Sequence, residues 1–410
     1  MYIDTIRLEN IRGFRELEFS FDRGEGQYAG WTVLTGDNGS GKSTVLKAMA
    51  LLLVGASTRF RLESRLNSYR SQGPKNGIVK LHSTNTQSPG TTTITTLTIH
   101  TDGCTEVKRE PIFSERALEA PAIKFSCGYG PFRRVAGHTE SASELMSAQQ
   151  SRCFATLFSE SASLAESANW LRELKYKSLE NKPKERKSLE LVLEVIRDEF
   201  LPNQITVDRV DSDGLWLKDR EGNLLSWADM SDGYRAALAL LTDILRHMIN
   251  AYSPDDLTGR DDEGRLFLKP AGVVLIDEID AHLHPEWQRE IGFWLKRHFP
   301  NIQFIVTSHS PLICQAADEN GLFVLPEPGS GNAPRALSRE ERQRIISSTP
   351  DTILRSPAFG LQNTRSEPAV QAQAKYSKLK AKQRAGAKLS SDEQGQLTQL
   401  GLFIPPDEES

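Results

Sequence analysis

The architecture of this chain follows from one stretch, Gly36-Asp37-Asn38-Gly39-Ser40-Gly41-Lys42-Ser43-Thr44. It comes after the apolar, strand-like residues 31–35 and before an apolar segment with helical spacing. Glycines in such a strand-to-helix turn allow backbone N–H groups to curve around phosphate oxygens at a helix N-terminus. Because the complete pattern Gly-x4-Gly-Lys-Ser is present in this order, it predicts a P-loop rather than a purely structural turn.

The P-loop assigns a role to each of its side chains. Lys42 is expected to place its charge on the β- and γ-phosphates, and the Ser43 hydroxyl to reach Mg²⁺. The remaining predicted phosphate-binding residues are Asn38, Gly39, Ser40, Gly41 and Thr44.

A second acidic motif follows another buried strand. Residues 272–276 are apolar throughout, as expected of a parallel strand, and they lead directly into Asp277 and Glu278. Asp277 is predicted to support Mg²⁺ and Glu278 to polarise a water molecule. A buried strand can also end in acidic loop residues without any chemistry, so this interpretation depends on the P-loop.

Three histidines lie close to these motifs. His309 follows a strand predicted at 303–306, at a sheet edge where ligand-facing groups collect, although a structural histidine is the alternative. His282 and His284 form a His-x-His pair that could bind a transition metal. Because a third spaced ligand is missing, a role in positioning the loop is the favoured interpretation.

The order of these motifs resembles that of ABC-type ATPase heads. The P-loop corresponds to Walker A, residues 231–233 (Ser-Asp-Gly) to the signature, Asp277 and Glu278 to Walker B, Asp280 to the D-loop and His309 to the switch histidine. Ser-Asp-Gly alone would be an ordinary helix cap. The resemblance implies ATP and Mg²⁺ as cofactors. It also implies head-to-tail dimers, in which Ser231, Asp232 and Gly233 complete the ATP site of another subunit.

The opening residues 6–14 and residues 278–285 resemble the RecF/SMC/OLD group of ATPases, which acts on DNA. The resemblance implies an α/β head over residues 1–326, with a mixed or parallel sheet, flanking helices and an N-terminal antiparallel β part. The predicted internal elements include a buried strand at 122–126 and a polar, acidic loop around 255–263. Because no sustained heptad pattern follows the P-loop, we expect a short helical lobe at about 140–200 instead of long coiled-coil arms. The Q-loop glutamine of this group has no counterpart in residues 125–134, where Arg133 and Arg134 are candidates for contact with phosphate or a partner.

A narrower resemblance, carried by the head motifs and residues 352–361, is to the PtuA-like ATPases of Septu and retron antiphage systems. It implies an ATPase that regulates a separate effector, an HNH nuclease. Residues 327–410 are predicted to form a linker and a helical tail without the acidic metal cluster of a nuclease. The alternatives are a RecF-type DNA-repair ATPase and an ATP-bound scaffold that sequesters a toxin.

Two basic segments are candidate contacts for DNA, RNA or a protein partner. Residues 371–390 contain no Asp or Glu, so this segment can neutralise phosphates in a salt-dependent way. A solvated helix face is the alternative for both segments. The candidate residues are Lys375, Lys378, Lys380, Lys382 and Arg384 in the tail, and Arg59, Arg61, Arg65 and Arg70 near the P-loop.

The composition agrees with a globular protein that stays in the cytoplasm. The chain has 410 residues, a formal net charge of -4 and four scattered cysteines, which we expect to be reduced thiols. The apolar runs are too short to span a membrane, and the first residues do not resemble a secretory signal. The mildly acidic total does not favour nucleic-acid binding, although it leaves room for a local basic face.

Overall fold

The computed structural model describes residues 1–63, 66–85, 92–111, 121–135, 145–146, 149–180, 182–326, 330 and 332–401. The chain divides into two compact units, Met1–Pro350 and Asp351–Ser410. This boundary lies later than the predicted one at residue 326, because strand β16 (Arg335–Ala336) pairs with β15 (Leu322–Val324) of the first unit. Residues 327–329 and 331 of the predicted linker lie outside the described residues.

A six-stranded sheet forms the centre of the first unit, in the order β16-β15-β3-β14-β13-β7. All neighbours except β15 and β16 run parallel. Every residue of β13 and β14 is buried, which explains why β13 is apolar throughout and why β14 is apolar except for Gln303 and Thr307. The strands that carry the site are β3 (Gly30–Thr35), β13 (Gly272–Ile276) and β14 (Ile302–Thr307).

The edge strand β7 (Ser126–Tyr129) corrects the strand predicted at 122–126. Its four residues pair in register with four consecutive residues of β13, from Val273 to Ile276. Lys124, inside the predicted strand, is exposed instead. The parallel pairing partner, which local sequence does not reveal, therefore sets the position of this strand.

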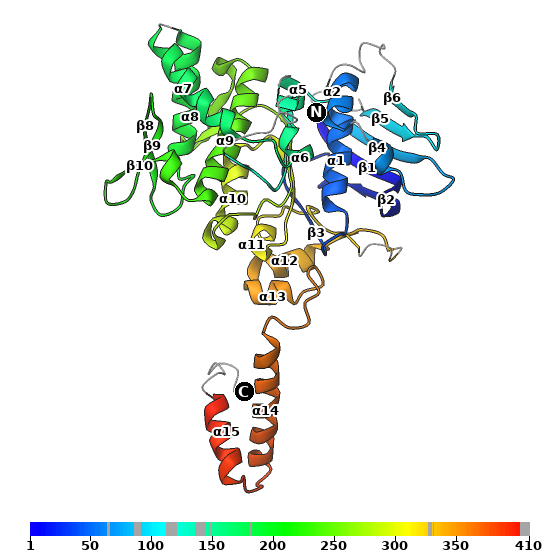
Figure 1. Ribbon diagram of the computed structural model, residues 1–410, viewed down its shortest axis with the longest axis vertical. Coiled ribbons are helices and arrows are strands. Elements are labelled where there is room, and N and C mark those ends of the chain that lie inside the picture. Colours follow the sequence, from blue (N-terminus) through cyan, green and yellow to red (C-terminus); the bar gives the residue numbers. More distant parts are fainter. Residues whose placement is uncertain are drawn as a thin grey trace. The chain divides into compact units, whose positions relative to one another are not determined.

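A second, antiparallel sheet confirms the predicted N-terminal β part. Helix α1 (Lys42–Leu53) contacts strands of both sheets, as Figure 1 shows on its right-hand side, and almost all of its residues are buried. After its polar first turn the helix is apolar on nearly all sides, which fits this position between two sheets. The sheet contains, in spatial order, β2 (Phe14–Ser20), β1 (Tyr2–Ile11), β4 (Gly77–Thr84), β5 (Thr92–Ile99) and β6 (Thr105–Glu110).

One fully buried glutamine joins the two sheets. The side chain of Gln303 on β14 accepts a hydrogen bond from the Ile3 N–H and donates one to the Ile3 carbonyl, both at 2.8 Å. These two bonds satisfy both backbone groups of Ile3 on β1 where water is excluded.

We expect Gln303→Met to lower the free energy of unfolding by about 2–3 kcal/mol, because both Ile3 groups lose their partner in a buried place. Urea unfolding followed by circular dichroism measures this change. Gln343→Met, on the exposed side of helix α12 (Arg339–Ser347), is the control and should change the stability by less than about 0.5 kcal/mol. Equal effects of the two substitutions would contradict the bridging role of Gln303.

A helical lobe with a small sheet occupies the left of Figure 1. Pro183 is the first residue of α8, so the predicted break at this proline is the start of a second helix. The helices of this lobe are α7 (Ala165–Leu179), α8 (Pro183–Arg197) and α9 (Asp232–Ala251). The short helices α5 (Gln149–Arg152) and α6 (Ala155–Phe158) lie nearer the centre of Figure 1, where α5 contacts α2 (Ala56–Leu62) and α6 contacts β7. The strands are β8 (Thr206–Asp211), β9 (Gly214–Lys218) and β10 (Leu224–Ser226).

The predicted acidic loop around 255–263 contains regular structure. Its acidic side chains lie around a short 3-10 helix and a tight hairpin. Acidic residues are typical of turns, so the local sequence predicts a loop but not the two short strands of the hairpin. These elements are η3 (Pro254–Asp256), β11 (Thr258–Arg260) and β12 (Leu266–Leu268). The other elements of the first unit are α2 (Ala56–Leu62), η1 (Leu66–Tyr69), η2 (Trp227–Asp229), α10 (Pro285–His298) and α11 (Pro311–Cys314).

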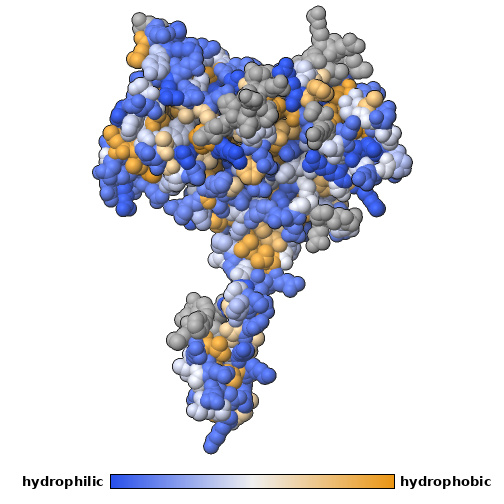
Figure 2. Space-filling model, viewed as in Figure 1, coloured by the Kyte–Doolittle hydropathy of each residue, from blue (hydrophilic) through white to orange (hydrophobic). Residues whose placement is uncertain are grey.

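The second unit is helical, as its sequence predicts. Helix α14 (Glu367–Arg384) packs on α15 (Ser391–Gly401), and Lys382 forms an ion pair with Glu393 at 2.6 Å. Helix α13 (Pro350–Leu354) lies at the boundary between the units. Hydrophilic residues dominate the face seen in Figure 2. No helix in the described ranges has the length and apolar character needed to cross a bilayer.

Candidate nucleotide site

Three neighbouring strands end at the same edge of the central sheet and bring the predicted site residues together. β14 lies between β3 and β13, and all three run parallel. The P-loop follows β3, Asp277 and Glu278 follow β13, and His309 comes shortly after β14. The carboxyl edge of a parallel sheet is where such folds bind ligands, so this edge is the candidate site.

The P-loop is shaped to receive an anion. Gly41, the N-cap of α1, has a φ of 92°, and a Cβ at this position would stand 2.3 Å from the Phe14 ring, so a side chain is excluded. The first N–H groups of α1 have no partner within the helix. The buried Ser40 hydroxyl also finds no partner among the described residues. These donors fit phosphate oxygens.

Lys42 lies folded against its own loop. Its Nζ donates hydrogen bonds to the carbonyls of Gly36 at 2.8 Å and Asp37 at 2.9 Å. Burial lowers the pKa of Lys42, although the nearby carboxylates of Asp277 and Glu278 act in the opposite direction. The Lys42 charge is thus influenced by the acidic pair, while its hydrogen bonds stay within the P-loop.

Thr307, at the end of β14, organises the acidic pair. Its hydroxyl donates a hydrogen bond to Asp277 Oδ1 at 2.6 Å and accepts one from the Glu278 N–H at 2.7 Å. Asp277 is buried, whereas Glu278 is exposed and has a left-handed φ of 47°. A buried carboxylate and the Ser43 hydroxyl are oxygen ligands that would suit Mg²⁺, and Glu278 is left accessible to water.

Arg133 holds the turn that follows the acidic pair, which corrects the expectation that it contacts phosphate or a partner. Its guanidinium is buried and donates hydrogen bonds to four carbonyls of this turn: Asp277 at 3.2 Å, Glu278 at 3.0 Å, Ile279 at 3.4 Å and Ala281 at 3.1 Å. Burial lowers the pKa of Arg133 to about 10, with Asp280, Asp277 and Glu278 opposing it. The residue therefore stays charged at neutral pH and fixes the backbone around the predicted D-loop residue Asp280.

The predicted signature lies at the start of α9, against this same turn. Ser231 is the exposed N-cap of α9, its side chain makes no capping hydrogen bond, and Asp232 pairs with Arg235. A Cβ on Gly233 would stand 2.3 Å from the His282 carbonyl oxygen. The glycine therefore permits close contact between the start of α9 and the turn after Glu278.

We expect Gly233→Ala to lower ATP turnover at least about tenfold, because the new methyl group must push the His282 turn away from α9. Phosphate release under saturating ATP measures this effect. Gly395→Ala is the matched control, since a Cβ at residue 395 meets nothing within 4 Å. An unchanged rate in Gly233→Ala would show that this contact has no bearing on the site.

A buried polar network fixes the middle of α9 to β7. Asp243 accepts a hydrogen bond from Tyr129 at 3.1 Å and forms ion pairs with Arg246 at 2.7 Å and His247 at 3.1 Å. Burial alone would lower the pKa of His247, but the Asp243 charge outweighs it and raises the pKa to about 10. The Tyr129–Asp243 hydrogen bond therefore ties the signature helix to the strand that precedes Arg133, and the two ion pairs within α9 balance the buried Asp243 charge.

The histidines fall into two groups. His309 is exposed at the sheet edge beside the P-loop strand, in the place predicted for a γ-phosphate sensor. His284 caps α10, because its Nδ1 accepts a hydrogen bond from the Glu286 N–H at 3.4 Å, and His282 has a left-handed φ of 68°. In the described parts of the chain, no three His, Cys, Asp or Glu side chains cluster as metal ligands would. The loop-positioning interpretation of His282 and His284 therefore fits their geometry.

Arg12 is a further neighbour of the P-loop that the sequence did not single out. Its Nη1 donates a hydrogen bond to the Thr44 hydroxyl at 3.3 Å, and its guanidinium lies 4.1 Å from the centre of the Tyr69 ring. The predicted nucleotide-binding residue Thr44 thus already has a basic partner. An arginine in the turn between two N-terminal strands carries no local signal for this contact.

The basic residues near the P-loop do not form one accessible face. Arg59 is buried and donates hydrogen bonds to the carbonyls of Leu51 at 2.6 Å and Val54 at 3.0 Å, so its expected role in nucleic-acid contact is corrected to closing the end of α1. Arg70 binds the carbonyl of Gly73 at 2.7 Å, and Arg61 is exposed. Arg65 lies outside the described residues.

The basic residues of the tail share one helix, α14. The exposed ones are Lys375, Lys378, Lys382 and Arg384, and Lys380 is half-buried with its Nζ 5.6 Å from the centre of the Tyr376 ring. A contact with DNA, RNA or a partner stays a prediction for these residues.

Comparison with known protein families assigns this chain to a family. The family described as "AAA domain, putative AbiEii toxin, Type IV TA system" matches residues 31–315. The chain belongs to this AAA-domain family. The match extends from β3 through β14, so it includes the P-loop, the signature and the acidic pair of the AAA domain.

Curated proteins similar to this chain include a Septu protein and a retron ATPase. The Septu protein PtuA of Bacillus mycoides is 28% identical over 377 residues, which cover 88% of this chain and 45% of the relative. The Retron Ec83 probable ATPase of Escherichia coli is 38% identical over 123 residues, or 30% of this chain and 21% of the relative. The chain thus spans less than half the length of these relatives. The predicted resemblance to PtuA-like ATPases is confirmed.

Solved structures place the AAA domain in the SMC-head fold. An SMC head bound to the C-winged helix domain of ScpA has a TM-score of 0.51 at 17% identity, over 84% of this chain and all of that one. The SMC head with an extended coiled coil from Pyrococcus furiosus has a TM-score of 0.52 at 16% identity, over 84% of this chain and 98% of that one. These likenesses confirm the predicted ABC-type α/β fold.

Proposed function

We propose that this protein hydrolyses Mg-ATP in head-to-tail dimers and thereby regulates a separate effector, an HNH nuclease, in antiphage defence. The observation that carries the ATPase part is the meeting of the P-loop, Asp277 and Glu278 at one sheet edge, held by Thr307 and Arg133. Similarity to the Septu protein PtuA supports the defence role.

Each residue of the candidate site has a separate role in the proposed hydrolysis of ATP. The P-loop amides, Lys42 and Ser43 bind the phosphates and Mg²⁺, and the metal ion neutralises charge on the β- and γ-oxygens when it is bound. Asp277 supports the metal, Glu278 orients and deprotonates the attacking water, and His309 contacts the γ-phosphate. Positioning and charge stabilisation provide most of the rate enhancement in phosphoryl transfer.

The exposed signature supports a site shared between two copies. The Ser231 side chain makes no capping hydrogen bond and is exposed to solvent at the start of α9. Its hydroxyl is therefore available to a phosphate of another subunit. In a two-fold dimer each nucleotide would lie between the P-loop of one chain and residues 231–233 of its partner.

Mixing two inactive variants tests this arrangement. Lys42→Ala disables a chain's own P-loop and Ser231→Arg disables the signature that the chain offers to its partner, so each variant alone should hydrolyse ATP very slowly. In an equal mixture, half of the dimers are mixed and each mixed dimer keeps one intact site of two. The rate per chain should therefore return to about one quarter of the wild-type value.

Rates that stay at the level of the single variants would argue against the shared site. In the control, the Ser231→Arg chain also carries Lys42→Ala. Its mixture with the Lys42→Ala chain then contains no intact P-loop and should show no recovery.

For the defence role, cells that carry this gene with its neighbours should resist phage, and Lys42→Ala should remove the resistance. Co-purification with a nuclease encoded beside it would identify the effector, whereas DNA-repair partners would support the RecF-type alternative.

A further inference from the structure

A cavity of about 320 Å³ lies between the segment that follows α8 and helix α10. We call it the aromatic groove, after Phe200, Trp287, Trp294 and Phe293, which line it. Three carboxylates, Glu199, Glu286 and Glu290, and one arginine, Arg297, complete its wall. The groove thus combines aromatic surface with an excess of negative charge.

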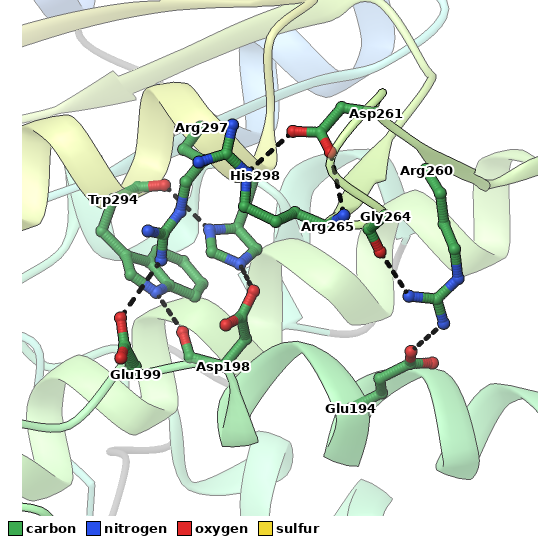
Figure 3. A network of polar contacts seen from close by, with 10 residues as sticks. All are labelled: Glu194, Asp198, Glu199, Arg260, Asp261, Gly264, Arg265, Trp294, Arg297 and His298. Atoms are coloured by element: carbon green, nitrogen blue, oxygen red, sulfur yellow. Dashed lines mark hydrogen bonds and ion pairs between the residues drawn. The ribbon is translucent and has the colours of Figure 1, made fainter.

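The aromatic part of the groove is rigid. The Phe200 ring centre lies 4.7 Å from that of Trp294 and 5.4 Å from that of Trp287. Trp294 donates its indole N–H to the Asp198 carbonyl at 2.7 Å and stacks on the His298 ring at 3.9 Å, as Figure 3 shows. His298 in turn contacts the Asp198 carboxylate at 2.8 Å. Because these rings are already held in place, binding of a ligand would cost little side-chain conformational entropy.

The charges around the aromatic groove are only partly matched. Arg297 approaches Glu199 at 3.9 Å, as seen in Figure 3, and Glu290 pairs with Arg289 at 2.9 Å. Within the described part of the chain, Glu286 has no ion pair. A groove with this charge repels phosphates and nucleic acid, whereas a cation would gain from both the carboxylates and the aromatic faces.

We propose that the aromatic groove binds a lysine or arginine side chain of a protein partner. The alkyl stem of such a side chain would pack on the aromatic rings while its charged end meets the glutamates. Phe293 is 45% exposed beside the cavity, so a polypeptide that continues past the basic residue could also cover this ring. None of the residues that line the groove belongs to the predicted nucleotide site, and the proposal does not depend on ATP hydrolysis.

The aromatic groove adjoins the signature. Trp287 packs on Tyr234, the residue after Gly233, with ring centres 5.5 Å apart. Tyr234 also accepts a hydrogen bond from Asn203, in the segment that follows α8, at 2.9 Å. A partner that fills the groove would therefore contact Trp287, which packs on the first turn of the helix that carries the signature.

Selection from a random 12-residue peptide library on the full chain tests the proposal. We expect the recovered peptides to share a Lys or Arg beside an apolar residue. The most frequent peptide, labelled with fluorescein, should bind with a Kd at least tenfold weaker to the double variant Glu286→Gln/Glu290→Gln and to Phe293→Ala. Replacement of its basic residue by norleucine should abolish binding.

The matched control is Glu221→Gln/Glu263→Gln, which removes the same charge from two exposed sites elsewhere and should change the Kd less than twofold. Thermal unfolding of each variant checks that the fold is retained. Peptides without a basic residue, or equal binding to wild type and to the Glu286/Glu290 variant, would overturn the proposal. Spermidine binding more tightly than the peptide, with the same dependence on Glu286, would also overturn it, because the groove would then take a small amine.

Discussion

Replacement of Glu278 by Gln should lower ATP turnover by about 10²- to 10⁴-fold, the usual contribution of a general base. Glutamine has the same shape and keeps the Glu278 N–H bond to Thr307, so the turn should stay in place. The P-loop donors and Asp277 are untouched, and ATP should therefore bind with an affinity within about threefold of wild type.

Phosphate release measures the turnover of Glu278→Gln, and a fluorescent ATP analogue measures its nucleotide affinity. Because bound ATP is no longer removed, light scattering should show a dimer that persists after excess ATP is washed away. Glu221→Gln, an exposed substitution in the turn between β9 and β10, is the control and should keep the wild-type rate. Undiminished turnover in Glu278→Gln would eliminate this residue as the base.

The parts of the site that could be predicted from sequence are those whose chemistry depends on neighbouring residues in the chain. The P-loop is one continuous stretch, and Asp277 and Glu278 directly follow an apolar strand, so both were visible without any knowledge of the fold. The parallel order of β3, β14 and β13 then brings these segments together. Here the physical rule that ligands bind at the carboxyl edge was sufficient.

The supporting residues could not be predicted, because their partners are distant in sequence. Gln303 forms hydrogen bonds with Ile3, which lies 300 residues earlier in the chain, and Arg133 donates hydrogen bonds to a turn more than 140 residues later. An arginine beside a glycine-rich segment has no local pattern that separates a phosphate contact from a structural one. Arg59 illustrates the same difficulty, since its helical neighbours suggest an exposed basic face while its own guanidinium is buried against α1.

Arg133→Met should have the second large effect, and it should act on both folding and turnover. Methionine occupies similar volume but gives no donors, so the carbonyls of Asp277, Glu278, Ile279 and Ala281 lose their shared partner. We expect the free energy of unfolding to fall by about 3–5 kcal/mol, because several buried carbonyl groups are left without a hydrogen-bond donor. ATP turnover should fall at least about 10²-fold, because Glu278 loses its fixed position.

Two further substitutions separate these effects. Arg134→Met alters the adjacent, exposed arginine and should leave both stability and turnover near the wild-type values. Arg133→Lys keeps the charge but cannot present the planar set of donors that reaches several carbonyls at once, so it should recover stability more than turnover. Urea unfolding and phosphate release on the same samples measure the two quantities. If Arg133→Lys restored full turnover, charge alone would be sufficient at this position, and the proposed fixing of the turn by several simultaneous hydrogen bonds would be wrong.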